Sequence, residues 1–409
     1  MAIDIAKYKG TPDLTISTQR SLWQDAWHRL ISSNTSRLGM FIVATFVFSA
    51  VLAHFFWKYN PAIDLDYTLK LKAPNLAATE EIPSIHLFGT DKLGRDIFRR
   101  TVHGGWNSLR VGIVAVGISL IIGGLLGLFA GFYENSLMTP GERLLLMGLF
   151  GFALGIFPTW IADQPFQMFL FGGLGVVSTL YSNFLEGQKI RIWLFAVIGL
   201  LIGGLPSLLI GPMVGLVCGI LGMAIGAFLA SPLGGQVFSN IVMRLMDIIL
   251  TFPGYLLAIA IVAFLGPGLE KGMIAIGIVG IPVYARLARS AVLSVFPKEY
   301  NIASQALGAS HGRIIFRHIV PNILSPIIVQ TTMGLASAIL SAAALGFLGL
   351  GAIPPEPEWG SMLGDSYRYL TSGSWWAVLF PGLAIMLSVL GFNLLGDGLR
   401  DALDPKLRT

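Results

Sequence analysis

Long apolar runs separated by short polar connections make up most of the chain after residue 37. Six of these runs are long enough to cross a bilayer as helices of about 20 residues. They lie at 38–57, 111–132, 246–265, 273–293, 323–350 and 377–395. Because a helix satisfies its own backbone hydrogen bonds in lipid, the pattern predicts an all-α fold, a polytopic membrane helical bundle.

A stretch between the second and third of these runs, 135–236, differs from the rest because it adds four more apolar runs. These lie at 144–160, 166–185, 192–210 and 213–230. Lys189 and Arg191 favour a cytoplasmic connection in the middle of the stretch, and four spans return the chain to the side where it began. Two spans with re-entrant segments are the alternative, because Gly203, Pro206 and Gly211 interrupt the later runs. With four spans the bundle has about ten helices.

Two polar stretches precede the second apolar run. Residues 1–37 form an N-terminal segment expected in the cytoplasm, where Trp23 and Trp27 fit either an amphipathic helix on the membrane surface or a loosely ordered tail. Residues 58–108 form an external loop within the first part of the core, 38–134. Many Lys and Arg in this loop oppose an external location, but long loops follow the positive-inside rule weakly and neighbouring acids offset the charge.

The end of the external loop contains Asp91, Arg95 and Asp96, which could be mistaken for a catalytic cluster. Gly89 and Gly94 bracket them as turn residues, and no nucleophile is placed to use them. The pattern therefore predicts a salt-bridged structural turn.

Composition and charge agree with a membrane protein and give it an orientation. The chain is 54% hydrophobic and 12% charged, against roughly 25% charged in a soluble domain. Its net charge of +5 is scattered at the ends of apolar runs rather than gathered in a stripe, so nucleic acid is not expected as a partner. Arg286 and Arg289 favour the cytoplasm, the acidic loop 352–370 favours the outside, and both termini are expected in the cytoplasm.

Several kinds of chemistry are missing from the sequence. No Gly-Lys pair occurs, so the GxxxxGK[ST] phosphate loop is absent, and the six histidines and the single Cys218 form no metal-ligand pattern. The apolar runs hold almost no charged residue at their centres, which disfavours an ion-coupled carrier. We therefore expect no enzyme, no cofactor bound by this chain and no metal site.

The polar and basic stretch 297–322 lies between two apolar runs. Ala303, Ala306 and Leu307 share one side at helical spacing, and Gly308 then loosens the helix. A short helix with small side chains can be contacted closely by another protein. An ordinary cytoplasmic loop is the alternative.

Five motifs in order resemble the inner-membrane permease subunits of binding-protein-dependent ABC transporters, in the dipeptide, oligopeptide and nickel importer group. They are FGTDKLGRDIF, MRLMDIILTFPGYLLAIAIVAFLGPGL, YARLARSAVLSVFPKEYNIASQALGASHGRIIFRHIVPN, LGFLGLGAIPPEPEWGSML and NLLGDGLRDALDP. The resemblance covers 38–134 and 237–405. It implies a type I importer core of six helices, to which 135–236 adds about four inserted helices.

The resemblance also implies partners and a coupling site. The partners are a homologous second permease, two ABC ATPase subunits that hold ATP and Mg, an external solute-binding protein and the bilayer. Within the second part of the core, 237–409, the loop 297–321 matches the family's EAA loop, whose short helix docks on an ATPase. The positions that match the motif are Ala303, Ala306, Leu307, Gly308, Ala309, Arg313, Pro321 and Asn322. The residues expected to couple to the ATPase are Glu299, Ala303, Ser304, Ala306, Leu307, Gly308, Ala309, Arg313 and Pro321.

Two departures from the family pattern bear on these expectations. Ile302 stands where the motif usually has its acid, so the acidic contact is missing unless Glu299, one turn earlier, supplies it. The inserted stretch 135–236 has no assigned function in the family; a scaffold or second-subunit contact is favoured over a regulatory module.

The resulting hypothesis is a multi-pass permease subunit in the bacterial inner membrane. It forms half of a translocation pathway for peptides or similar small solutes, and ATP hydrolysis takes place on partner subunits. The alternative is a stand-alone channel or secondary carrier for a small solute.

Overall fold

The computed structural model describes residues 22–57, 59–60, 64–78, 84–136, 197 and 234–403. Within these ranges the secondary structure is helical, apart from two isolated β-bridges. The α-helices are α1 (Leu22–Ser32), α2 (Asn34–Phe56), α3 (Ile97–Ile118), α4 (Gly124–Asn135), α9 (Gly234–Thr251), α10 (Gly254–Leu265), α11 (Leu269–Val295), α12 (Glu299–Ala306), α13 (His311–Arg313), α14 (Val320–Phe347), α15 (Trp359–Ser366) and α16 (Trp376–Leu403). Two π-helical segments, η3 (Ser119–Gly123) and η4 (Ile314–Ile319), and two 3-10 turns, η2 (Tyr67–Leu69) and η5 (Tyr367–Tyr369), complete the order.

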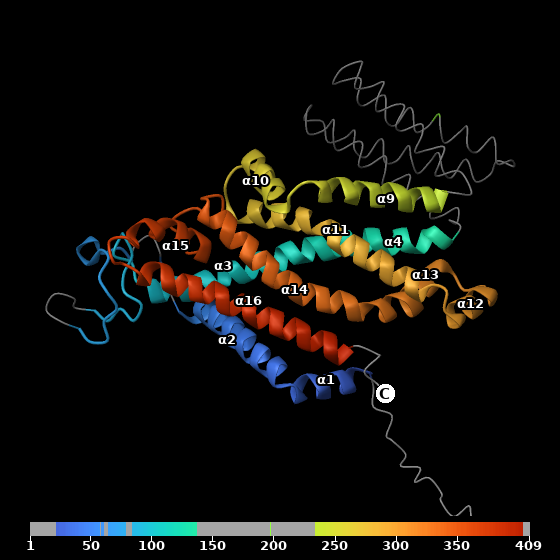
Figure 1. Cartoon of the computed structure of the whole chain (residues 1–409), viewed down its shortest axis with the longest axis horizontal. Helices are drawn as coiled ribbons and strands as arrows, with labels where there is room; N and C mark the ends of the chain where they lie inside the picture. The colour runs from blue at the N-terminus through green and yellow to red at the C-terminus, as the bar shows by residue number, and fades with distance from the viewer. Residues whose placement is uncertain are drawn as a thin grey trace, which may run out of the picture.

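The long helices run side by side in one elongated bundle (Figure 1). Helix α2 packs on α16, α16 packs on α14, and α14 packs on both α3 and α11, which also contacts α4 and α9. The largest buried cluster joins α3, α14, α15 and α16 through Ile97, Ile339, Trp359 and Phe392. Helices α12 and α13 lie at one end of the bundle, and α15 lies at the opposite end (Figure 1).

Five helical segments of the described residues are long and apolar enough to cross a membrane. They are Asn34–Phe56, Ile97–Asn135, Leu269–Val295, His311–Phe347 and Trp376–Leu403. A sixth candidate is the bent pair Phe238–Thr251 and Gly254–Leu265. The predicted all-α polytopic bundle is confirmed, and these five or six spans correspond in order to the six apolar runs of the predicted core.

One predicted span is wrong as a straight helix. The run 246–265 is divided at Phe252 and Pro253, where α9 and α10 meet at 91°. Proline cannot donate the next helical hydrogen bond, and its ring clashes with the preceding turn. Pro253 has φ −57° and ψ 122° and instead begins α10.

The N-terminal helix α1 is amphipathic, which agrees with one of the two structures predicted for this segment. Ala26 and Leu30 are buried against Ala402 of α16, whereas Trp27 is exposed. The loosely ordered alternative is therefore wrong for 22–32, and the expected place of this helix on a membrane surface stays a prediction.

Small residues bring η3 and α4 against α11. A Cβ atom added at Gly127 would lie 2.1 Å from the carbonyl oxygen of Ala285, and one at Gly123 would lie 2.3 Å from that of Ile281. Because both obstacles are backbone atoms, a side chain at either position forces the helices apart.

Gly127→Ala is therefore expected to destabilise the fold by about 3 kcal/mol, since overpacking against backbone cannot be relieved by a rotamer change. The matched control is Gly117→Ala in α3, where an added Cβ meets no atom within 4 Å. Thermal unfolding of both variants in detergent checks the prediction. Equal unfolding temperatures for the two variants would contradict it.

The two ends of the inserted stretch lie next to each other. A Cβ atom at Gly235 would lie 2.3 Å from the carbonyl oxygen of Tyr133. Ser239 Oγ also lies 3.3 Å from Glu134 Oε2. The chain therefore leaves the core and returns to it at one place, which lets a long insertion leave the core packing intact. The predicted four spans of 135–236 lie outside the described residues, apart from the ends of the stretch and Val197.

Candidate functional site

The short helix predicted within 297–322 is present as α12, and the sequence explains where it begins and ends. Lys298 is extended, and Glu299 places a carboxylate in the first turn, where the helix dipole favours negative charge. At the other end, Gly308 N–H donates to Gln305 O at 2.9 Å and Ala309 N–H donates to Ser304 O at 3.0 Å. This pair of bonds is the Schellman arrangement, which requires a left-handed residue, and Gly308 supplies it with φ 76°.

One buried polar side chain fixes α12 to the bundle. Asn301 is fully buried, and its Nδ2 donates to Val295 O, the last residue of α11, at 2.8 Å. On the other side, Ser304 Oγ lies 3.3 Å from His318 Nε2 of η4. Helix α12 is therefore joined to the segments on both sides of it.

Beneath α12 and α13 lies a buried apolar cluster that connects three long helices. Phe132 of α4, Val292 of α11 and Ile314, Ile315 and Ile319 of η4 are all buried together. Ala309, immediately after the coupling helix, packs against the same cluster. The segment that follows α12 therefore shares one closely packed interior with α4, α11 and the start of α14, and such interiors deform little.

Behind this cluster an ion pair joins α4 to α11. Arg289 donates from Nε and Nη2 to the two carboxylate oxygens of Glu134, each at 2.9 Å. Two parallel hydrogen bonds make this ion pair stronger and more precisely oriented than a single bond would. Ser239 of α9 contacts both partners, so the pair closes the core where the inserted stretch departs.

The outward surface of α12 is open. Leu307 is 89% exposed, and Ile302 is 57% exposed. Phe316 of η4 adds a third exposed apolar side chain, 67% exposed. Large exposed apolar side chains at the end of a membrane bundle indicate a contact surface for another protein. We call Ile302, Leu307 and Phe316, together with Ala303 and Ala306 of α12, the docking surface.

The nine residues predicted for coupling fall into two groups. Glu299, Ala303, Ala306, Leu307, Gly308, Arg313 and Pro321 are exposed, whereas Ser304 and Ala309 are half-buried. Ser304 faces His318 and Ala309 faces the apolar cluster, so these two support the helix rather than forming its outer face. Pro321 lies in the first turn of α14 and Arg313 ends α13. Whether these residues contact an ATPase stays a prediction.

Sequence reasoning missed Asn301 and Phe316 and treated Ile302 as a defect of the motif. Ile302 is one of the most exposed apolar side chains of α12. An isoleucine in place of the usual acid makes this position of the exposed surface apolar rather than charged. The sequence did contain one sign of this surface: Phe316 lies between Arg313 and Arg317, and an aromatic residue among exposed cations is typical of a contact surface.

At the opposite end of the bundle, the charged cluster of the external loop is a structural turn, as predicted. Asp91 Oδ1 accepts the backbone N–H groups of Leu93 and Arg95, and its Oδ2 lies 2.7 Å from Arg95 Nε. Gly89 and Gly94 have φ values of 74° and 76°. Asp96 caps α3 at the N–H of Arg99 and pairs with His86. The described residues hold no group of three or more His, Cys, Asp or Glu able to ligate a metal.

A second buried acid, Glu358, begins α15 at the same end. Its carboxylate accepts the N–H groups of Gly360 and Ser361, each at 2.8 Å. Burial raises the pKa of the Glu358 carboxyl to about 7, although these hydrogen bonds oppose the shift. A Cβ at Gly346 would lie 2.0 Å from its Oε2, so glycine is required where α14 meets this acid.

The stability of this end is expected to fall as the pH rises. Between pH values of about 4.5 and 7 the folded protein keeps the Glu358 proton while the unfolded chain has lost it, so the free energy of unfolding decreases by up to about 3 kcal/mol. Glu358→Gln is expected to remove this slope, and the exposed Glu356→Gln is expected to keep it. Unfolding temperatures at pH 5 and 8 check the prediction; an unchanged slope in Glu358→Gln would contradict it.

Comparison with known proteins gives two family matches. Residues 222–409 match the model described as the binding-protein-dependent transport system inner membrane component. Residues 21–74 match the N-terminal TM domain of oligopeptide transport permease C. The second match covers α1 and α2, and the first covers α9 to α16, including the docking surface.

Individual relatives extend the match over nearly the whole chain. The chain is similar to the dipeptide transport system permease protein DppC of Alkalihalophilus pseudofirmus, 36% identical over 392 residues, which are 96% of this chain and 92% of the relative. It is 31% identical over 398 residues to the glutathione transport system permease protein GsiD of Pectobacterium atrosepticum, covering 97% and 96%. DppC of Escherichia coli is 53% identical over 168 residues, 41% of this chain and 56% of the relative.

The long matches also bear on the inserted stretch. A match over 392 or 398 of 409 residues leaves too few residues to omit 135–236. These relatives therefore have a counterpart of the stretch, which is not peculiar to this chain.

Proposed function

Because the chain belongs to the inner-membrane permeases of binding-protein-dependent transport systems, and is thus a transmembrane subunit of an ABC importer, we propose that its solutes are peptides. The relatives named above transport dipeptides and, in one case, glutathione. Glutathione is itself a small peptide, so the names agree on one chemical class. The chain supplies one half of the pathway, and a homologous second permease supplies the other.

The docking surface supports coupling to partners that hydrolyse ATP. Two ABC ATPase subunits hold ATP and Mg²⁺, and an external solute-binding protein delivers the peptide. The observation that carries this proposal is an exposed helix, α12, fixed by Asn301 to α11 and standing on a cluster that reaches α4, α11 and α14. A surface that is both accessible and rigidly connected is suited to receive a movement from outside.

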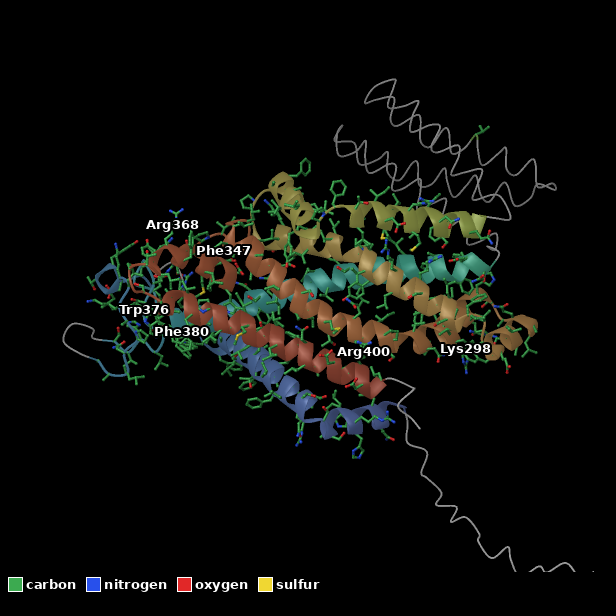
Figure 2. The ribbon with its side chains drawn as sticks, viewed as in Figure 1. Lys298, Phe347, Arg368, Trp376, Phe380 and Arg400 are labelled. Atoms are coloured by element: carbon green, nitrogen blue, oxygen red, sulfur yellow. The ribbon has the colours of Figure 1, made fainter. Side chains whose placement is uncertain are left out.

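Charge supports an orientation with the docking surface and both termini in the cytoplasm. Figure 2 shows Lys298 at the α12 end and Arg368 and Trp376 at the opposite end. The α12 end also presents the exposed Arg313 and Arg317, as the positive-inside rule requires of a cytoplasmic connection.

Four cations of the external loop are paired with acids. Lys92 lies 2.6 Å from Asp365, and Arg95 and Arg100 lie 2.7 and 3.6 Å from Asp91. Arg99 lies 4.0 Å from Asp64.

In this mechanism the ATPase subunits close on ATP, and α12 moves with the ATPase to which it is docked. The buried cluster passes the displacement to the membrane helices as a rigid-body rotation, which exposes the pathway alternately to the two sides.

Reconstitution tests the proposal. The purified complex is expected to contain two ATPase chains and a second permease, and its proteoliposomes are expected to take up a labelled dipeptide only with the binding protein and ATP. The isolated chain is expected to be inert. Nucleotide-independent uptake by the isolated chain would instead identify a channel or secondary carrier.

A further inference from the structure

A groove of about 230 Å³ lies among α3, α11 and α14. Its polar lining residues are Ser119, Tyr284, Gln330, Ser337 and Ser341, and Gly334 lies among them. A second hollow of about 240 Å³, beside α10, shares Ile276, Val279 and Ser341 with it. The two hollows are therefore neighbours along the side of the bundle.

The groove follows the unpacked face of α14. Gln330, Gly334, Ser337 and Ser341 are spaced by four, three and four residues, so they share one face of the helix. Ser337 is exposed and the other three are half-buried. The opposite face of α14, with Ala336 and Ile339, is buried in the bundle.

This face differs from one that suits lipid. On α2, a helix of the same bundle, the exposed positions at a spacing of seven are Phe41, Phe48 and Phe55. Large apolar side chains are stable in contact with lipid acyl chains, whereas burying an amide or a hydroxyl there without a hydrogen bond costs free energy. The polar face of α14 therefore requires a polar or protein environment.

Hydrogen bonding within the chain satisfies only part of this face. Ser337 Oγ donates to Met333 O at 3.3 Å, and Tyr284 Oη donates to Gln330 O at the same distance. Among the described residues, the side-chain amide of Gln330 and the hydroxyl of Ser341 have no hydrogen-bond partner. Unsatisfied groups at the depth of a membrane must meet water, a solute or another subunit.

The helices around the groove are shaped to leave it open. Gly334 allows the Tyr284 hydroxyl to lie against α14, since a Cβ there would be 2.5 Å from that oxygen. Ser119 begins the π-helical segment η3, and its Oγ donates to Gly277 O at 2.7 Å across to α11. Single π-turns within long helices occur frequently at functional sites.

We propose that this groove is the chain's wall of the solute pathway, and that its neutral donors and acceptors contact the amide groups of a peptide rather than its charges. None of its lining residues is Asp, Glu, Lys, Arg or His. A wall of hydroxyls and one amide gives hydrogen bonds to any peptide backbone without selecting side-chain charge. The assignment rests on the proposed function.

Cysteine accessibility in the assembled complex tests the assignment. Cys218→Ala removes the single native cysteine, and Ser337→Cys is compared with Phe48→Cys on the exposed face of α2. A membrane-impermeant, positively charged methanethiosulfonate reagent is expected to modify Ser337→Cys about tenfold faster or more, because the reactive thiolate forms in water and not in lipid. Modification is expected to block dipeptide uptake.

Each alternative has its own outcome. If Ser337→Cys reacts in the isolated chain but not in the complex, the face is a subunit interface and the proposal fails. Equal slow reaction at both positions, or modification that leaves uptake unchanged, also overturns it. Wild-type complex that shows no ATP-dependent peptide uptake would overturn the proposed function instead, so the two failures are distinguishable.

The uncharged character of the wall has a separate readout. Ser337→Asp is expected to raise the uptake of a lysine-containing dipeptide over a glutamate-containing one by about fivefold, because a new charge in a confined site discriminates. The isosteric Ser337→Asn is the control and is expected to leave the ratio near that of the wild type. An unchanged ratio in both variants would contradict contact between this wall and the solute.

Discussion

Leu307→Asp is expected to abolish ATP-driven uptake, with a loss of about 100-fold or more, while the chain still inserts and pairs with its second permease. Leu307 is 89% exposed and packs against nothing that its loss would disturb. In the docking that we propose, the same side chain is an apolar anchor of a small contact surface, where replacing it by a charge is expected to cost several kcal/mol. The measurement is dipeptide uptake together with co-purification of the ATPase chains.

A matched variant separates the docking surface from general effects of exposed leucines. Leu370→Asp changes an exposed leucine at the opposite end of the bundle and is expected to leave ATPase association intact. If Leu307→Asp retains both its ATPase partners and uptake, the docking surface is assigned incorrectly.

Gly308 allows a second test of the same surface. An added Cβ there meets no atom within 4 Å, but φ is 76°, so Gly308→Ala strains the backbone by about 1 kcal/mol without a clash. Gly308→Trp adds bulk to the same strain. Uptake by the Gly308→Trp variant is therefore expected to fall far below uptake by the Gly308→Ala variant. Equal uptake would mean that the loss comes from backbone strain alone and not from bulk on the docking surface.

The membrane spans could be predicted because apolar length alone determines them. The beginning of α3 could not. Sequence reasoning began this span at residue 111, yet the helix begins at Ile97 and includes Arg100 and Asn107. Arg100 is buried beside Asp91 and Asn107 Nδ2 donates to Pro357 O at 2.8 Å. These partners lie far away in sequence or in a loop, so local hydropathy contains no sign of them.

Helix α12 was predictable in position, but its attachment to the bundle was not. Gly308 ends the helix because glycine readily adopts the left-handed backbone conformation, so this helix end can be recognised from the sequence alone. Asn301 looks like any polar helix residue, and its burial under α11 depends on how α12 folds back. The break at Pro253 was visible in the sequence as Phe-Pro-Gly, but apolar residues on both sides concealed it from a reading based on hydropathy.

The groove was unpredictable for a further reason. Gln330, Ser337 and Ser341 are three mildly polar residues in a long apolar run, which a hydropathy average treats as noise. These residues stand out only in the folded structure, where the face that they share is left unpacked. The other sides of α14 contact α3, α11 and α16.

Asp91→Asn is expected to produce the largest loss of stability among single substitutions in the external loop. Asp91 is 6% exposed, and Arg95 and Arg100 are each 3% exposed. Among the described residues, Asp91 is the single acid paired with either arginine. Its neutralisation leaves two guanidinium groups buried without a counter-charge, which costs about 3–5 kcal/mol.

Thermal unfolding in detergent measures this loss, and Asp64→Asn is the matched control. Asp64 lies 4.0 Å from Arg99, and the side chains of Arg99 and Asp64 are 46% and 39% exposed, so this change is expected to cost less than about 1 kcal/mol. The double variant Asp91→Asn with Arg95→Met is expected to recover part of the loss, because it removes one of the unpaired charges. If Asp91→Asn proves as mild as Asp64→Asn, the turn is held by its backbone hydrogen bonds and glycines, and the buried charges contribute little to it.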